Sequence, residues 1–244
     1  MPEGPSIVIL KEAVQIFNGK KIIEATGNAK IDKSLLINKK VVFKSWGKHF
    51  LICLPGITVR IHLLMFGSYS INKPTKPASS LRLCLKFKNG TIYFYTCSIK
   101  LLEEGAAELY DWSADVMSDE WDAVKARKKL KAIRTTAACD ALLDQQIFSG
   151  VGNIIKNEVL YRIMVHPESV IGKIPLHILS LLINEARLYS FDFLKWKKAF
   201  ELKKHWLAYT KKTCMRCNLP FIKKYCGKTK RRTFFCANCQ LLYI

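Results

Sequence analysis

Apolar and polar residues alternate with a period of two across residues 41–95, the pattern of strands that bury one face. The clearest run is residues 81–87, where Leu or Phe at each odd position alternates with Arg, Cys and Lys. Pro55-Gly56 and Asn89-Gly90 supply turn residues between such runs. The pattern predicts antiparallel strands at residues 41–44, 49–54, 57–63, 68–71, 81–87 and 91–95.

The apolar period becomes helical on either side of this block. Apolar residues recur at helical spacing from Ile7 to Phe17 and predict a first helix that ends at Asn18-Gly19. Residues 121–133 predict a second helix, whose basic run would ordinarily form a solvated face. The order of elements indicates an α+β protein, in which an N-terminal antiparallel β-sandwich with a flanking helix precedes a helical domain.

A glycine-rich turn, Gly150-Val151-Gly152, separates two helical patterns. We expect the apolar helix before it to end at Ser149-Gly150 and the next helix to open at Asn153, a strong N-cap residue. Apolar residues spaced by four predict that next helix: Ile155, Val159 and Ile163. Such a turn can bind an anion, because its free N–H groups and the helix dipole point the same way. An ordinary helix–turn–helix corner is the alternative.

The chain is strongly basic, with 40 Lys and Arg against 19 Asp and Glu and a net charge of +21. This charge favours a polyanionic partner, most simply nucleic acid. An anionic membrane surface is the alternative, but no apolar run approaches the ~18 residues of a membrane span. Residues 103–122 contain acids and no Lys or Arg, whereas residues 203–244 contain bases and no Asp or Glu. The asymmetry suggests an acidic connector kept away from the polyanion.

Length and cysteine usage narrow the class of protein further. A chain of 244 residues can form two compact units, each with a core. Its start lacks a charged segment followed by an apolar core, so we expect no secretory signal peptide. The cysteine pattern suits a reducing compartment. We expect a monomer in the cytoplasm, associated with the nucleoid in a bacterium.

Four of the nine cysteines form two C-x-x-C pairs near the end of the chain: Cys214 with Cys217, and Cys236 with Cys239. Two paired thiolate knuckles suit one tetrahedral Zn²⁺, which would be structural because protein fills all four positions. Disulfides are the alternative. Cys226 lies outside this frame. Six cations lie between the knuckles: Lys223, Lys224, Lys228, Lys230, Arg231 and Arg232.

The first residues offer both a structural and a chemical interpretation. Pro2 and Pro5 can simply be helix-entry residues. If Met1 is removed, however, Pro2 presents a secondary amine with a pKa near the ~8 of an α-amino group, and this amine can attack a sugar C1′. Such an amine forms an iminium ion directly. Glu3 would lie beside it, placed to protonate the ring oxygen or to shuttle protons.

The sequence resembles the formamidopyrimidine-DNA glycosylase/endonuclease VIII family in four features, which occur in the same order along the chain. They are the Pro2-Glu3 start, Gly47-Lys48 in a hairpin, the stretch at 142–167 with its glycine turn, and the cysteine finger. The resemblance implies that Pro2 is the nucleophile and Glu3 its neighbouring acid. It also implies that Lys48 contacts phosphate beside the scissile sugar. The glycine turn would be the family's helix–two-turn–helix motif.

The resemblance further assigns DNA contacts. The turn would bind a phosphate through Gly150, Gly152 and Asn153, and Arg231 would hold the phosphates that flank the lesion. A loop would fill the gap left by an everted base with Leu64, Met65 and Phe66, since neighbouring residues cannot all face inward. Two positions depart from the family. Ser6 stands where glutamate is usual, and Cys139 where purine-lesion members often carry lysine.

Together these observations predict a bifunctional DNA glycosylase/AP lyase, nearer the endonuclease VIII branch, that removes oxidised bases through a Pro2 Schiff base and β,δ-elimination. Its partner would be damaged double-stranded DNA. The predicted domains are residues 1–110 (β-sandwich), 111–120 (acidic linker), 121–208 (helix–two-turn–helix) and 209–244 (zinc finger). A non-catalytic zinc-finger DNA-binding protein of the same fold is the alternative. The N-terminal motif and the loop at 64–66 lean towards oxidised pyrimidines.

Overall fold

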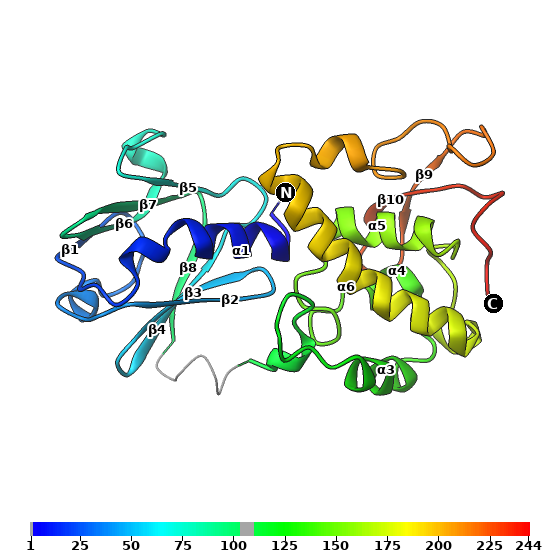
Figure 1. Cartoon of the computed structure of the whole chain (residues 1–244), viewed down its shortest axis with the longest axis horizontal. Coiled ribbons are helices and arrows are strands. Elements are labelled where there is room, and N and C mark those ends of the chain that lie inside the picture. The colour runs from blue at the N-terminus through cyan, green and yellow to red at the C-terminus, as the bar shows by residue number, and fades with distance from the viewer. Residues whose placement is uncertain (1, 103–109) are drawn as a thin grey trace. The chain divides into compact units, whose positions relative to one another are not determined.

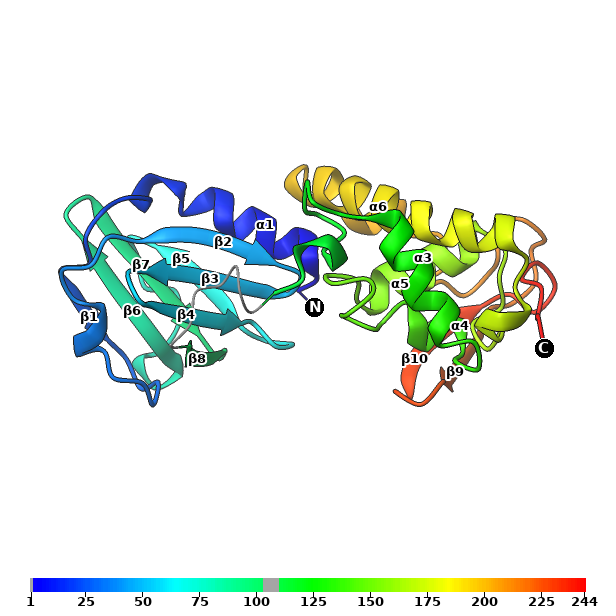
Figure 2. The same cartoon turned by 90° about the horizontal axis from the view of Figure 1, so that it is seen from below.

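The computed structural model describes residues 2–102 and 110–244 (Figures 1 and 2). The chain divides into a first unit, residues 1–110, and a second unit, residues 111–244. The greater part of the predicted acidic connector, residues 103–109, lies outside the described residues. Among the described helices, none is long and apolar enough to cross a membrane.

The first unit is a sandwich of two four-stranded antiparallel sheets with one flanking helix. One sheet has the order β1-β6-β7-β5 and the other β2-β3-β4-β8. The strands are β1 (Glu24–Thr26), β2 (Val42–Trp46), β3 (His49–Leu54), β4 (Ile57–His62), β5 (Ser68–Ile71), β6 (Leu81–Phe87), β7 (Gly90–Tyr95) and β8 (Ser98–Leu102). The helices are α1 (Gly4–Ala13), η1 (Gln15–Phe17), η2 (Ser34–Leu36) and η3 (Ala78–Ser80).

The alternating pattern is confirmed closely in this unit. β3, β5 and β6 have the predicted bounds, and Leu83, Leu85 and Phe87 face the core while Lys86 is exposed. Two strands were not predicted. β1 has only three residues and exposes two of them, so it carries no apolar alternation. β8 pairs with β4 on one side only, and its identity as a strand depends on that partner.

The second unit is helical, with a two-stranded hairpin near its end. Its helices are η4 (Trp112–Ala114), α3 (Ala123–Ala132), α4 (Ala138–Ala141), α5 (Asn153–Arg162), η5 (Ile171–Lys173), α6 (Leu176–Lys198) and η6 (Leu202–His205). Strands β9 (Ile222–Cys226) and β10 (Arg231–Phe235) form the hairpin. Cys226 and Phe235 belong to the same apolar core as α5 and α6, so the hairpin packs on the helices rather than on a core of its own.

Residues 111–120 pack within this second unit. The Ser149 N–H donates to the Ala114 carbonyl at 2.8 Å, and the Val116 N–H donates to the Ser149 carbonyl at 3.2 Å. Asp115 and Val116 are buried. The proposed linker therefore contacts the turn that precedes α5. The boundary between residues 121–208 and 209–244 stays a prediction.

Two expectations about the glycine turn were wrong. The helix before it, α4, ends at Ala141 rather than at Ser149-Gly150, and a series of turns covers the interval. Asn153 is not the N-cap of α5: Gly152 occupies that position, in an extended conformation. Asn153 is instead the first helical residue, and its side chain binds another segment of the chain, described below.

Candidate functional site

The start of α1 holds Glu3 in a defined position. Glu3 is fully buried and is the N-cap of the helix. Its carboxylate accepts the Ser6 N–H, while the Ser6 hydroxyl accepts the Glu3 N–H at 3.4 Å, which together form a capping box. Ser6 thus completes the cap that orients Glu3, next to the half-buried Pro2.

Lys48 lies at the same end of the first unit. It occupies the turn between β2 and β3 after Gly47, whose φ of 50° suits the tight hairpin that glycine permits. α1 packs against β2 and β3, and Figures 1 and 2 place the amino end of α1 beside this turn. The structure therefore brings Pro2, Glu3 and Lys48 to one end of the sandwich.

The loop of Leu64, Met65 and Phe66 also starts at this end. β3 and β4 pair with His49 opposite His62, so the loop after β4 lies beside the Lys48 turn. The three side chains are 50%, 54% and 74% exposed, as expected for residues that cannot all face inward. Three neighbouring large apolar side chains are therefore exposed in the part of the chain that the structure describes.

His62 holds the base of this loop. Its Nδ1 accepts the Leu64 N–H at 2.9 Å, while Leu64 adopts a left-handed φ of 55°. Burial, together with the charges of Lys48 and Arg60, lowers the pKa of His62, which keeps the imidazole neutral and its Nδ1 able to accept. The neighbouring His49 behaves alike: burial first, then Arg60, lowers its pKa to about 4. The spacing of these histidines gave no sign of this role.

In the second unit, Gln145 stabilises the glycine turn. Its Oε1 accepts the Gly150 N–H at 3.1 Å, and its Nε2 donates to the carbonyls of Leu143 and Val151. Gly150 has a φ of 98°, a conformation that favours glycine. The N–H of Gly150 therefore already has an acceptor within the chain.

Helix α5 binds the hairpin strand β10 through polar side chains. The Asn153 Nδ2 donates to the Arg232 carbonyl at 2.9 Å, and the Asn157 Oδ1 accepts the Phe234 N–H at 2.7 Å. The fully buried Lys156 donates to the Thr233 hydroxyl at 2.7 Å. Sequence reasoning missed these contacts, because partners nearly eighty positions apart carry no local signal. Asn153 thus connects the two segments predicted to bind phosphate.

Glu158 has a comparable structural role. It is fully buried, and its carboxylate accepts the backbone N–H groups of Leu207, Ala208 and Tyr209 at 2.8 to 3.1 Å. These bonds satisfy a charge that would otherwise be costly to bury. They fasten the segment that leads into the cysteine finger to the middle of α5.

The four predicted metal ligands converge. The Sγ atoms of Cys214, Cys217, Cys236 and Cys239 all lie within 4.8 Å of one another, with a Cys217–Cys236 separation of 3.4 Å. Tetrahedral Zn–S bonds of ~2.3 Å require sulfurs ~3.8 Å apart, so the set fits one ion. All nine cysteines are free thiols, which argues against the disulfide alternative.

The sulfurs compete for protons. Burial raises the pKa of Cys214, but donation from the Tyr161 hydroxyl and from backbone N–H groups prevails and lowers it to about 6. The pKa of Cys239 rises to about 12 through its interaction with Cys217, burial and the other sulfurs. A bound dication would remove this competition by stabilising all the thiolates.

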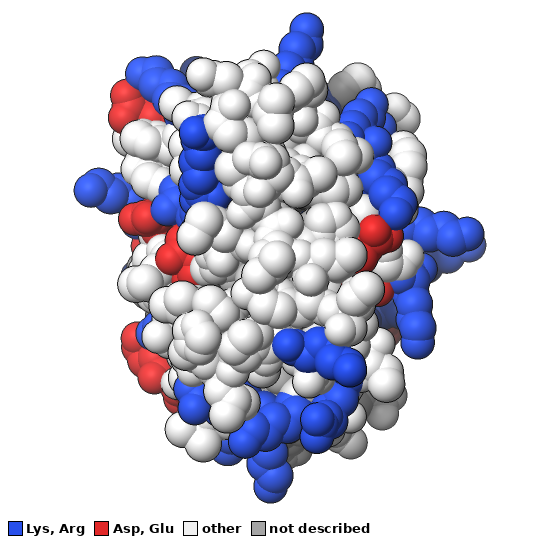
Figure 3. Space-filling model, turned by 90° about the vertical axis from the view of Figure 1, so that its right-hand side faces the viewer, with Lys and Arg blue, Asp and Glu red and all other residues white. Residues whose placement is uncertain are grey.

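Arg231 opens β10 and is exposed, opposite the buried Cys226. The next residue of the strand, Arg232, lines a pocket of about 410 Å³ together with Thr210, Lys211, Lys212, Phe221, Lys223 and Phe234. Four of these residues are cations and none is acidic. On the face shown in Figure 3, Lys and Arg gather at the lower edge and the sides around a broad uncharged centre. The basic lining of the pocket suits an anionic ligand.

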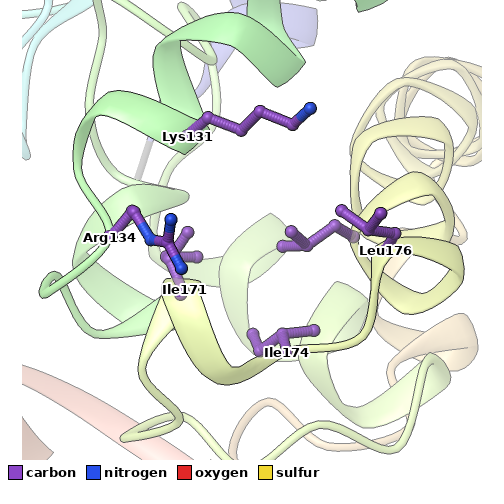
Figure 4. Close-up of a pocket in the computed structure, with 7 residues that line it drawn as sticks. Lys131, Arg134, Ile171, Ile174 and Leu176 are labelled. Atoms are coloured by element: carbon purple, nitrogen blue, oxygen red, sulfur yellow. The ribbon is translucent and has the colours of Figure 1, made fainter.

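A smaller pocket of about 250 Å³ lies between α3, η5 and α6. Figure 4 shows Lys131 and Arg134 on one side of it, Leu176 on the other, and Ile174 at its base. None of the predicted site residues lines this pocket. Lys131 of the basic α3 run borders it instead.

Comparisons with known proteins agree with this arrangement. Residues 113–188 match the family of the formamidopyrimidine-DNA glycosylase H2TH domain. "Endonuclease 8-like 3" of Xenopus laevis is 31% identical over 205 residues, covering 80% of this chain and 33% of that protein. The human protein of the same name is 29% identical over 201 residues, with the same coverage of 80% and 33%. The chain thus spans about a third of the length of these relatives.

Solved structures share the whole fold. A viral DNA glycosylase superposes with a TM-score of 0.84 at 21% identity, covering 98% of this chain and 100% of that one. The Lactococcus lactis formamidopyrimidine DNA glycosylase bound to DNA with an AP site superposes with a TM-score of 0.83 at 20% identity, covering 98% and 99%. At this identity the likeness establishes the fold alone.

Proposed function

Because the chain belongs to the formamidopyrimidine-DNA glycosylase/endonuclease VIII family, nearer its endonuclease VIII-like members, we propose that it is a DNA glycosylase with AP lyase activity in base excision repair. The observation that carries this proposal is the convergence of Pro2, Glu3 and Lys48 at one end of the first unit. An amine, a carboxylate and a cation in one place are the groups that a Schiff-base mechanism on a phosphate-linked sugar needs.

In the proposed reaction the Pro2 nitrogen attacks C1′ of the damaged nucleoside. The N–C1′ bond forms, the glycosidic bond breaks, and the base leaves with a proton. Glu3, held by its capping box with Ser6, protonates the ring oxygen O4′, so that the C1′–O4′ bond breaks and the opened sugar becomes an iminium ion of Pro2. The resulting iminium ion acidifies the C2′ proton, whose loss expels the 3′ phosphate, and a second elimination expels the 5′ phosphate. Lys48 offsets the charge of the neighbouring phosphate.

The second unit would bind the DNA backbone. We assign phosphate binding to Gly152 and Asn153 at the amino end of α5, and to Arg231 on the hairpin. Gly150 would act through the shape of the turn, because its N–H is bonded to Gln145. Zn²⁺ held by the four cysteines would have a structural role, because no ligand position is left for water. When bound, the ion supplies the cross-link that keeps the short hairpin folded.

The exposed loop would act when the base leaves the helix. Eversion costs a few kcal/mol, and an apolar side chain inserted into the gap offsets part of that cost. We assign this role to Leu64, Met65 and Phe66, which lie at the same end of the first unit as Lys48.

We propose oxidised pyrimidines and abasic sites as the preferred lesions. Three contiguous fillers suit the endonuclease VIII pattern, and in the region 97–104 the residues Ser98–Leu102 form strand β8 rather than a loop that could read an opposite base. Residues 103 and 104 lie outside the described residues. Single-turnover rates should therefore be higher for thymine glycol than for 8-oxoguanine paired with cytosine. The reverse order would assign the chain to the other branch.

A non-catalytic DNA-binding protein is the second candidate. Cys139, which stands where a lysine is common, is buried, and burial raises its pKa to about 12, so it offers substrate no charge. In this second interpretation the missing lysine would reduce base excision while the contacts with the DNA phosphates remain.

Borohydride trapping separates the two candidates. Added during reaction with abasic DNA, it should reduce the Pro2 imine and leave a stable protein–DNA adduct. The Pro2→Gly variant, or a chain that retains Met1, should form at least about 100-fold less trapped adduct while still binding DNA. Mass spectrometry of the amino terminus is the control for removal of Met1. A robust adduct in a chain that keeps Met1 would assign the amine to a lysine, and no adduct at all would favour the binding protein.

A further inference from the structure

An acidic side chain holds the tip of the most basic hairpin in the molecule. The turn between β9 and β10 spans residues 227–230, and Asp140 of α4 lies against it. The Asp140 carboxylate accepts the Lys228 N–H at 2.7 Å, the Thr229 N–H at 3.2 Å and the Thr229 hydroxyl at 2.8 Å. Successive N–H groups of a turn form an anion-binding concavity, and here a carboxylate of the chain itself fills it.

The turn is shaped around this carboxylate. Gly227 has a φ of 70°, and a Cβ built on it would lie 2.3 Å from Asp140 Oδ2. The backbone conformation favours glycine at this position, and a side chain here would push the Asp140 carboxylate away from the turn. The contact joins residues 88 positions apart, so it is a tertiary feature and not a local turn motif.

The charge of Asp140 indicates that its contact with the turn serves to fix the geometry of the turn. Asp140 adds a negative charge next to a hairpin that carries six cations: Lys223, Lys224, Lys228, Lys230, Arg231 and Arg232. For a polyanionic ligand this charge is unfavourable, since it lowers the attractive field of the hairpin. Its favourable contribution is therefore the fixed geometry of the turn.

Arg231 is the residue whose position this geometry decides. It follows the turn directly, and the strand beyond it is held by Asn153 at the Arg232 carbonyl and by Asn157 at the Phe234 N–H. Arg231 thus lies between two anchored points, one on α4 and one on α5. A guanidinium that binds phosphate in a forked geometry loses affinity when its backbone can move.

We propose that Asp140 is a positioning residue that aims Arg231 at a DNA phosphate, an inference that rests on the proposed DNA-binding function. The two explanations of Asp140 predict opposite signs. If the carboxylate acts only through its charge, its removal tightens DNA binding. If it positions Arg231, its removal weakens binding in spite of the gained positive charge.

The test measures binding of the zinc-loaded full chain to a duplex with a tetrahydrofuran abasic-site analogue, across a range of salt concentrations. Asp140→Ala should weaken binding about 10-fold, the effect of one charge-assisted hydrogen bond, and should lower the slope of log K against log salt by about one. Asp140→Asn, which keeps one acceptor oxygen and the shape, should lie between Asp140→Ala and the unchanged chain. It also replaces Asp140→Ala if that variant fails to retain zinc.

Glu168→Gln is the matched control. Glu168 binds the Lys224 side chain of the same hairpin at 2.8 Å, so this change removes the same charge without touching the turn. It should bind DNA as tightly as the unchanged chain or more tightly. If Asp140→Ala and Asp140→Asn behave like Glu168→Gln, the proposal is overturned.

A double-mutant cycle with Arg231→Ala closes the test. Arg231→Ala alone should weaken DNA binding about 10-fold. The double variant Asp140→Ala/Arg231→Ala should bind less than about 2-fold more weakly than Asp140→Ala alone, because in that variant the guanidinium is already misplaced. Full additivity would refute positioning of Arg231 by Asp140 while leaving DNA binding intact. If Arg231→Ala alone binds normally, the proposed role of Arg231 in DNA binding fails, and with it the inference.

Discussion

The two units differ in how many polar side chains they bury. Among the described residues, the buried polar or charged side chains of the first unit are Glu3, Ser6 and Thr58. In the second unit they include Asp115, Asn153, Lys156, Asn157, Glu158, Thr233 and Gln240. The first core is therefore held mainly by apolar contact between the sheets and α1, whereas α5 and the hairpin combine a shared apolar core with paired polar groups that surround α5.

The difference has physical consequences. Apolar packing tolerates substitutions of similar volume. The core of the sandwich can therefore accept such substitutions without a change in the proposed catalytic residues at its end. A buried polar network is less tolerant, because deletion of one partner leaves another group desolvated and unpaired. We therefore expect the second unit to respond sharply to single polar changes, and the first to respond mainly at its exposed end.

The largest effect should come from the metal site. Cys236→Ser should release Zn²⁺ and unfold β9 and β10, because so short a segment has little core of its own. DNA affinity should fall on the order of 100-fold through loss of the hairpin's phosphate contacts. Zinc content, DNA titration and hydrogen exchange measure the result. Equal loss of amide protection in β3 would show that the units do not respond separately.

Glu158→Ala should destabilise the second unit by about 3 kcal/mol, since one buried and two partly buried N–H groups lose their acceptor. Glu24→Ala is the control in the first unit: its contact with Lys86 is 3.7 Å long and both side chains are more than half exposed, so the change should cost under about 0.5 kcal/mol. Denaturant unfolding measures both. Similar values for the two variants would remove the contrast between the units.

Phe66→Ala should leave stability within about 0.5 kcal/mol, because the side chain is 74% exposed. Base release from a duplex should nevertheless slow by about 10-fold, while release from a single-stranded lesion should stay unchanged, since only the duplex leaves a gap to fill. Single-turnover kinetics on the two substrates decide this. Equal slowing on both would assign Phe66 to the base pocket rather than to the gap.

The smallest effect concerns pH. His49 has a pKa of about 4 in the folded chain against about 6.5 when unfolded, because burial and the charge of Arg60 disfavour the cation. Stability should therefore be full above pH 6.5 and fall as the pH drops towards 4, by on the order of 1 kcal/mol for this half-buried group. Unfolding free energies at pH 7.5 and 4.5 should differ less in His49→Gln. An unchanged pH dependence in that variant would exclude His49 as the source.

Prediction from the sequence succeeded where the signal was local. The bounds of β3, β5 and β6 follow from local apolar pattern and flanking turn residues, with clear alternation in β6, and the spacing of the cysteine pairs anticipated the cluster of four sulfurs. It failed at Asn153, whose residue type favours an N-cap, because the tertiary bond to the Arg232 carbonyl outweighs that local preference. β8 was missed for the same reason, since its partner strand defines it.

The sequence by itself determined the apolar alternation of the sandwich, the glycine turn before α5, the excess of positive charge and the four thiols. Each of these is a property of neighbouring residues or of composition, so it can be seen before folding. Only tertiary packing brings Asp140 and α5 to the hairpin that they hold between them. These contacts connect residues 88 and 79 positions apart, and a hydrogen bond between such segments depends on how packing brings them together rather than on any spacing along the chain. The contacts of Ser6 with Glu3 and of His62 with Leu64 are local, within three residues, and depend on the backbone conformation of each segment.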